Sequence, residues 1–226
     1  MGIEIKICGL KTASTLEAAL EAGADLVGFV HFPKSPRHLT VAELPALSAR
    51  VRGRALKVAL TVDADDATLA ALVAALDPDI LQLHGKESPE RVSAIRARFG
   101  RPVMKALPIA RREDLSAIPA YAAVADRLLF DAKPAPDDAL PGGNGRPFDW
   151  RLLAGLDVSR PAMLSGGLDA DNVAEALSLA RVDGVDVSSG VEDAPGVKSP
   201  DKIFAFIAAA RRAAAMKGAA PSTASS

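Results

Sequence analysis

Two side chains that could transfer protons each lie at the end of a short apolar run. Cys8, the single cysteine of the chain, ends the alternating run 3–8, and Asp131 follows Leu128-Leu129-Phe130. A thiolate and a carboxylic acid on opposite sides of a sugar can move protons in two directions. A cysteine is also a common small core hydrophobe, and an aspartate is a common helix cap. Position alone therefore leaves a structural interpretation of both residues open.

Lys6 is placed to influence Cys8. Isoleucines alternate with polar residues over 3–8, as in a strand, so Lys6 and Cys8 share one face. A reactive thiolate needs a depressed pKa, which a neighbouring ammonium group favours. A lysine inside a barrel also needs a counter-charge. We expect Asp186, on the strand that closes against the first, to form a structural ion pair with Lys6.

Glycine-containing turns follow the last two predicted strands. They are Ser165-Gly166-Gly167 and Ser188-Ser189-Gly190. In a barrel of parallel strands, the loops after strands seven and eight often bind phosphate, through backbone N–H groups and a short helix N-terminus. Either turn alone is ordinary, but the two together in these loops predict a phosphate site. The sequence therefore indicates a small phosphorylated ligand.

Four other polar residues are weaker candidates. Arg37, in a loop with two prolines, is either a solvated loop residue or a bidentate clamp for a carboxylate. His84 ends a strand and either contacts the ligand or caps a turn. Lys86 and Glu87 are predicted to lie on the surface. The histidines and carboxylates show no metal-ligand spacing, so no metal is predicted.

The elements that must position these residues alternate regularly between strand and helix. The predicted strands cover 3–7, 26–30, 57–62, 80–83, 103–107, 127–130, 162–164 and 184–187. The predicted helices cover 14–21, 42–50, 66–76, 89–99, 112–122, 170–180 with Asp169 as its cap, and 200–214. A long loop, 132–148, precedes a short helix capped by Asp149. This alternation predicts a single (β/α)8 TIM barrel, of class α/β. A doubly wound sheet is the alternative, but its usual glycine-rich first turn is missing.

Composition fits one large domain. The chain has 226 residues, 49% of them hydrophobic and 24% charged, which suits a barrel of about 200 to 250 residues. A formal net charge of −1 argues against binding nucleic acid, and the apolar runs are too short for a membrane span. The lone cysteine suits a reducing cytoplasm. We expect a barrel domain over 1–214 and a disordered tail over 215–226, and the sequence leaves monomer or homodimer open.

Several short motifs resemble phosphoribosylanthranilate isomerase, in the order found in that family. They are KICGL at 6–10, FPKSPR at 32–37, QLHG at 82–85, FD at 130–131, GGNG at 142–145 with FDW at 148–150, SGGL at 165–168 and DVSSGVE at 186–192. The similarity covers about 3–214, and the motifs are highly specific as a set. One departure is Asn144, where the family commonly has threonine.

The resemblance implies the third step of tryptophan biosynthesis, a cytoplasmic amino-acid biosynthesis reaction. N-(5-phosphoribosyl)anthranilate is converted to 1-(2-carboxyphenylamino)-1-deoxyribulose 5-phosphate by an Amadori rearrangement. Asp131 is implied as the general acid that opens the furanose, and Cys8 as the general base that removes the proton from C2. Arg37 is implied as the clamp on the anthranilate carboxylate, and no metal or organic cofactor is implied. The residues expected to bind substrate are Arg37, His84, Gly166, Gly167, Asp186, Ser188, Ser189 and Gly190.

Other functions remain as alternatives. A sugar-phosphate epimerase would usually need metal ligands, and indole-glycerol-phosphate synthase would need a lysine–glutamate set that these strand ends lack. A barrel that only binds a phosphosugar is the non-enzyme alternative. Cys8 and Asp131 at opposite strand ends argue against it, because binding alone requires neither.

Overall fold

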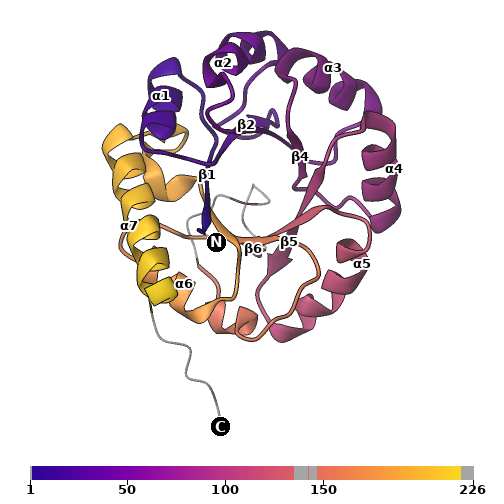
Figure 1. Cartoon of the computed structure of the whole chain (residues 1–226). Coiled ribbons are helices and arrows are strands. Elements are labelled where there is room, and N and C mark those ends of the chain that lie inside the picture. Colours follow the sequence, from indigo (N-terminus) through magenta and orange to yellow (C-terminus); the bar gives the residue numbers. More distant parts are fainter. Residues whose placement is uncertain (1, 135–141, 143–146, 220–226) are drawn as a thin grey trace.

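The structure, a computed structural model, is a closed barrel of eight parallel strands surrounded by helices (Figure 1). It describes residues 2–134, 142 and 147–219. Each strand pairs with the next one along the chain, and β8 closes the barrel against β1. The predicted (β/α)8 fold is therefore confirmed. Asn144, most of the predicted loop over 132–148, and the end of the predicted tail over 220–226 lie outside the described residues.

The eight barrel strands occur where the apolar runs predicted them. Their bounds are β1 Glu4–Cys8, β2 Leu26–His31, β3 Leu56–Thr61, β4 Ile80–Leu83, β5 Val103–Ile109, β6 Arg127–Ala132, β7 Ala162–Leu164 and β8 Gly184–Val187. Because the strands are parallel, their carboxyl ends meet at one mouth of the barrel, which is where side chains at strand ends can combine into a site.

The helices form the outer ring. The α-helices are α1 Ala13–Glu21, α2 Leu44–Val51, α3 Asp66–Leu76, α4 Pro89–Phe99, α5 Ile118–Ala122, α6 Val173–Leu179 and α7 Pro200–Ala219. Short 3-10 helices are η1 Val41–Glu43, η2 Arg112–Ala117, η3 Trp150–Leu153 and η4 Ser189–Val191. The start and end of α4 follow local chemistry: the Ser88 hydroxyl caps its first turn, and Gly100, with φ of 60°, ends it.

Three parts of the outer ring differ from the predictions. Asp169 does not cap a helix at 170, because its carboxylate accepts from the N–H groups of Asp171 and Asn172 in a turn, so α6 begins at Val173. The first half of the predicted helix 112–122 is the 3-10 helix η2. Helix α7 continues beyond 214 to Ala219, and Lys217, predicted to lie in a disordered tail, donates to the carbonyl of Leu177 at 2.8 Å.

A short hairpin after β8 was not predicted at all. It consists of β9 Glu192–Ala194 and β10 Val197–Lys198, which pair antiparallel. Runs of two and three residues are too short to show a strand period in the sequence. The hairpin places Glu192 and Lys198 beside the mouth of the barrel.

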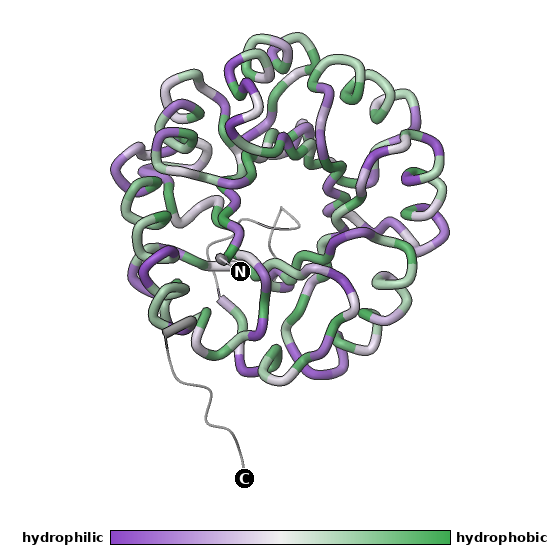
Figure 2. The backbone as a smooth tube through the Cα atoms, in the orientation of Figure 1, coloured by the Kyte–Doolittle hydropathy of each residue, from purple (hydrophilic) through white to green (hydrophobic). Residues whose placement is uncertain are grey.

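The main core lies between the strands and the helices, and the barrel interior has its own layers. Seven apolar side chains fill the interior at the amino-terminal end of the strands, namely Leu26, Val58, Ile80, Met104, Ala106, Leu129 and Met163. Figure 2 shows hydrophobic residues along most of the inner ring, while the helices carry mixed colours. Towards the mouth the inward side chains are mixed: Lys6, Gln82 and Asp186 are buried and polar, and Val30 and Leu60 are apolar. No helix in the described ranges has both the length and the apolar character needed to cross a membrane.

Candidate active site

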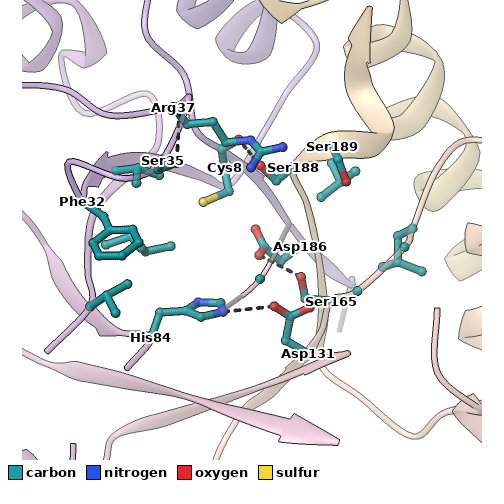
Figure 3. A pocket seen from close by; sticks show the side chains of 18 residues that line it. Cys8, Phe32, Ser35, Arg37, His84, Asp131, Ser165, Asp186, Ser188 and Ser189 are labelled. Carbon is teal, nitrogen blue, oxygen red and sulfur yellow. Dashed lines mark hydrogen bonds and ion pairs between the residues drawn. The ribbon is translucent and has the colours of Figure 1, made fainter. Parts of the chain in front are cut away.

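A pocket opens at the carboxyl ends of the strands, and most of the predicted site residues line it (Figure 3). Cys8 points into it from β1, and the pair formed by His84 and Asp131 lies on the opposite side. The other predicted site residues that line this pocket are Arg37, Gly166, Gly167, Asp186, Ser188 and Ser189. Gly190 does not line the pocket. The mouth of the barrel thus brings together side chains that the sequence separates by up to about 180 residues.

The predicted ion pair between Lys6 and Asp186 is present. Nζ of Lys6 donates to Oδ1 of Asp186 at 2.8 Å, both side chains are buried, and Ser165 donates to the other carboxylate oxygen at 3.1 Å. Burial works against the Lys6 ammonium, but Asp186 and Cys8 outweigh it and raise the pKa of Lys6. The cation beneath Cys8 therefore stays charged.

Cys8 is itself almost completely buried, with 3% of its surface exposed. Burial raises the pKa of the Cys8 thiol above its usual value, and the attraction of the thiolate to Lys6 offsets only part of this effect. The sequence left the protonation state of Cys8 open, and in the folded barrel burial has the larger effect. Lys6 makes the thiolate less unfavourable but does not make it the dominant form.

Gly28 on β2 leaves the space that Cys8 and Lys6 occupy. It pairs with Cys8 in the barrel, and a Cβ atom there would lie 2.9 Å from the Cys8 sulfur and 3.2 Å from Nζ of Lys6. Such distances are too short for a side chain to be added without displacement. The sequence shows a glycine in this strand but not what it faces.

Asp131 lies next to the last residue of β6, and each of its two carboxyl oxygens has a nitrogen partner. Nε2 of His84 lies 3.0 Å from Oδ2, and the backbone N–H of Ala132 donates to Oδ1 at 2.9 Å. Behind the histidine, Nε2 of Gln82 lies 3.1 Å from Nδ1 of His84. Gln82 lies in the QLHG motif at 82–85, but no role was predicted for it.

Arg37 is buried and takes part in a network of charges that the sequence did not reveal. Its Nε and Nη2 atoms each donate to Glu192 at 2.8 Å, and Lys198 donates to the same carboxylate at 2.7 Å. Burial acts against the Glu192 carboxylate, but the two cations outweigh it and lower the pKa of Glu192. Burial also lowers the pKa of Lys198, to about 8, although Glu192 opposes this change. Arg37 is therefore no solvated loop residue.

Lys198 connects this network to Cys8. It donates to the backbone carbonyl of Ser188 at 2.8 Å, and the Ser188 hydroxyl donates to the carbonyl of Cys8 at 3.2 Å. Among the described residues of this network, Arg37 and Lys198 carry two positive charges and Glu192 one negative charge. This excess of positive charge favours anionic groups of a ligand and a negative charge on Cys8.

An apolar wall lines the pocket next to Arg37. Its members are Val30, Phe32, Leu60 and Val62. A wall of this kind beside a cation fits a flat apolar group that carries a negative charge. The alternating pattern of β2 and β3 gives the inward positions in these strands, but the wall forms only when the barrel closes.

The two predicted phosphate turns lie side by side at the mouth. Gly166 and Gly167 have positive φ values of 86° and 67°, which other residues rarely adopt. Gly190 packs against the other turn, because a Cβ there would overlap the carbonyl oxygen of Leu168. The two turns therefore approach each other closely, and both contribute residues to the lining of the pocket.

Glu87 is not on the surface, contrary to the prediction. It is 5% exposed and pairs with Lys105 of β5 at 2.9 Å. Its carboxylate also accepts from the N–H groups of Asp63 and Gly85, so it ties the loops after β3 and β4 together. The sequence could not reveal this, because Lys105 lies in a different strand–helix unit. No group of three His, Cys, Asp or Glu within residues 2–134, 142 and 147–219 could hold a metal ion.

The sequence and structure match one enzyme family along most of the chain. Residues 5–209 match the family model described as N-(5'phosphoribosyl)anthranilate (PRA) isomerase. The N-(5'-phosphoribosyl)anthranilate isomerase of Azorhizobium caulinodans is 75% identical over 215 residues, which cover 95% of this chain and 94% of that protein. That of Bradyrhizobium diazoefficiens is 63% identical over 211 residues, covering 93% and 95%.

Solved structures agree. The phosphoribosyl anthranilate isomerase of Thermotoga maritima has a TM-score of 0.84 and 32% identity, covering 93% of this chain and 99% of that one. A phosphoribosyl anthranilate isomerase in complex with reduced 1-(o-carboxyphenylamino)-1-deoxyribulose 5-phosphate has a TM-score of 0.81 and 31% identity, with the same coverage. Together with the closed barrel and the pocket at its mouth, these matches identify the chain as a member of the phosphoribosylanthranilate isomerase family.

Proposed function

We propose that this protein converts N-(5-phosphoribosyl)anthranilate to 1-(2-carboxyphenylamino)-1-deoxyribulose 5-phosphate in tryptophan biosynthesis, with Cys8 and Asp131 as its base and acid. The observation that carries the assignment of roles is that these two groups enter one pocket from opposite sides. A sugar held between them presents its ring oxygen to one and C2 to the other. A related enzyme that binds a reduced form of the product supports the choice of ligand.

In the first step, Asp131 gives its proton to the ring oxygen. The bond between C1 and the ring oxygen breaks, and the nitrogen lone pair forms a protonated imine with C1. The aspartate becomes a carboxylate, which the N–H groups of His84 and Ala132 stabilise by donating to its two oxygens.

In the second step, the Cys8 thiolate removes the proton from C2. The electrons of that bond move to the imine and give an enol, in which C1 and C2 are joined by a double bond. The enol becomes the ketose when C1 gains a proton and the C2 hydroxyl loses one, so the atoms of substrate and product balance. Lys6, held by Asp186, stabilises the thiolate that starts this step.

Binding is assigned to the rim of the pocket. Arg37 holds the anthranilate carboxylate, with Phe32 and the apolar wall against the aromatic ring. The turn 165–167, together with Ser188 and Ser189, holds the phosphate through backbone N–H groups. As part of the same proposal, the enzyme acts in the cytoplasm, as a monomer or a homodimer, without a metal or organic cofactor.

The test is a fluorescence assay with the purified protein. N-(5-phosphoribosyl)anthranilate should lose its fluorescence when the protein is added, at the same rate in EDTA. The aminoaldose of histidine biosynthesis serves as a second substrate to measure specificity. A protein that binds the product analogue without turning over the substrate would establish the binding-only alternative. An activity that EDTA removes and a divalent metal restores would contradict the absence of a metal.

A further inference from the structure

Gln82 lies at the inner end of a chain of three polar side chains that leads to the acid. Gln82 lies in β4 and His84 directly follows its last residue, so the two side chains, two residues apart, point to the same side. Gln82 is fully buried, and the hydrogen bond to His84 is the contact of its amide nitrogen, at 3.1 Å. Since His84 in turn reaches Asp131 at 3.0 Å, the orientation of the amide affects the acid through the imidazole.

The chemistry of the amide decides where the histidine carries its hydrogen. Nε2 of Gln82 can only donate, so Nδ1 of His84 must accept. The neutral ring then has its hydrogen on Nε2, directed at Asp131. With the amide reversed, its NH2 group would take the place of Oε1, which is buried and has no hydrogen-bond partner among the described residues. A buried carbonyl oxygen without a partner is tolerated better than a buried N–H group, which favours the orientation with Nε2 toward His84.

We propose that Gln82 is a positioning residue for the isomerisation, because it keeps the hydrogen of neutral His84 on Nε2 and so makes the ring a donor to Asp131. This inference rests on the proposed function. Asp131 becomes a carboxylate when it protonates the ring oxygen, and a hydrogen bond to a carboxylate is stronger than one to a carboxylic acid. The bond from His84 therefore strengthens as the ring opens, so it accelerates this step.

The hydrogen on the imidazole can be observed directly by 15N NMR of labelled protein. Loss of signals in His84→Asn identifies His84 among the three histidines. In the wild-type protein we expect neutral His84 with hydrogen on Nε2 and none on Nδ1. Gln82→Glu should move the hydrogen to Nδ1, because a carboxylate accepts there. Gln82→Met, of similar size but without a donor, should leave a mixture of both forms.

Kinetics provide the second measurement. Both Gln82 variants should lower kcat by about 10-fold with KM within about two-fold, less than the 10²- to 10⁴-fold expected for loss of an acid or base itself. The matched control is Thr61→Val on the neighbouring strand, which removes a buried hydroxyl that has no hydrogen-bond partner within residues 2–134, 142 and 147–219. It should change neither the His84 signals nor kcat.

Three results would overturn the inference. One is a wild-type His84 with its hydrogen on Nδ1, which decides the matter even if Gln82→Met fails to fold. Another is an unchanged hydrogen position in both Gln82 variants. The third is a moved hydrogen with unchanged kcat. A wild-type protein without isomerase activity would instead contradict the proposed function, which the NMR measurement does not require.

Discussion

Glu192 accepts hydrogen bonds from both Nε and Nη2 of Arg37, each 2.8 Å long, although the two residues are 155 positions apart in the sequence. Both side chains are less than a tenth exposed, so the guanidinium plane is held in one orientation. Lys198 holds the same carboxylate from the hairpin. Arg37, which is proposed to bind the substrate carboxylate, is thus oriented by the buried Glu192.

Removing the Arg37 side chain should raise KM more than it lowers kcat. Arg37→Ala should raise KM by about 10- to 100-fold, the value of a charge-assisted hydrogen bond, and Arg37→Lys should restore it only in part because lysine lacks the planar fork. Glu192→Gln should also raise KM, since its NH2 group opposes the guanidinium. Steady-state kinetics test all three. The control is Glu17→Gln, which alters a comparable pair with Arg54 on the surface and should leave KM unchanged. Normal KM in both Arg37 variants would contradict the assignment.

Loss of Asp131 or Cys8, the proposed acid and base, should instead lower kcat more than it changes KM. Cys8→Ala and Asp131→Asn should each lower kcat by about 10²- to 10⁴-fold with much smaller changes in KM, because their groups act in the transition state. Folding of the variants is checked by circular dichroism. If Cys8→Ala keeps near-normal kcat, Cys8 is only a small core side chain.

The space at Gly28 should be required for catalysis. In Gly28→Ala the added Cβ would lie 2.9 Å from the Cys8 sulfur, so the thiol or Lys6 must move. We expect kcat to fall by about 10-fold or more, because a shift of about 1 Å in a reacting group can cost 10²-fold. Gly2→Ala is the control, since nothing lies within 4 Å of its added carbon. Equal kcat in Gly28→Ala and the wild type would show that the position of Cys8 is not critical.

Alkylation of Cys8 should depend on pH in a defined direction. Burial raises the pKa of Cys8, so the reactive thiolate is a minority at neutral pH and increases as the pH rises through the raised pKa. The rate of inactivation by iodoacetamide should therefore keep rising beyond about pH 8.5, the ordinary thiol value. The phosphorylated product should slow it by covering the thiol. A rate that levels off below pH 8 would instead indicate a depressed pKa.

The sequence by itself determined the elements and the faces of the strands. Alternation over 3–8 put Lys6 and Cys8 on the same face. Eight strand–helix units without the glycine-rich first turn of a doubly wound sheet favoured the closed barrel that is observed. The end of β6 at the mouth followed from the same rule, and with it the place of Asp131. These features depend on local patterns, which a sequence records directly.

Only the tertiary structure decided the partners of the buried charges. Glu87 was predicted to lie on the surface, but it is buried in an ion pair with Lys105. Glu192 pairs with Arg37 and with Lys198, and Lys198 lies in a hairpin that was not predicted. The net effect of burial on the Cys8 thiol was likewise hidden. The physical reason is that solvation and ion pairing depend on distances across the closed barrel, and no spacing along the chain specifies those distances.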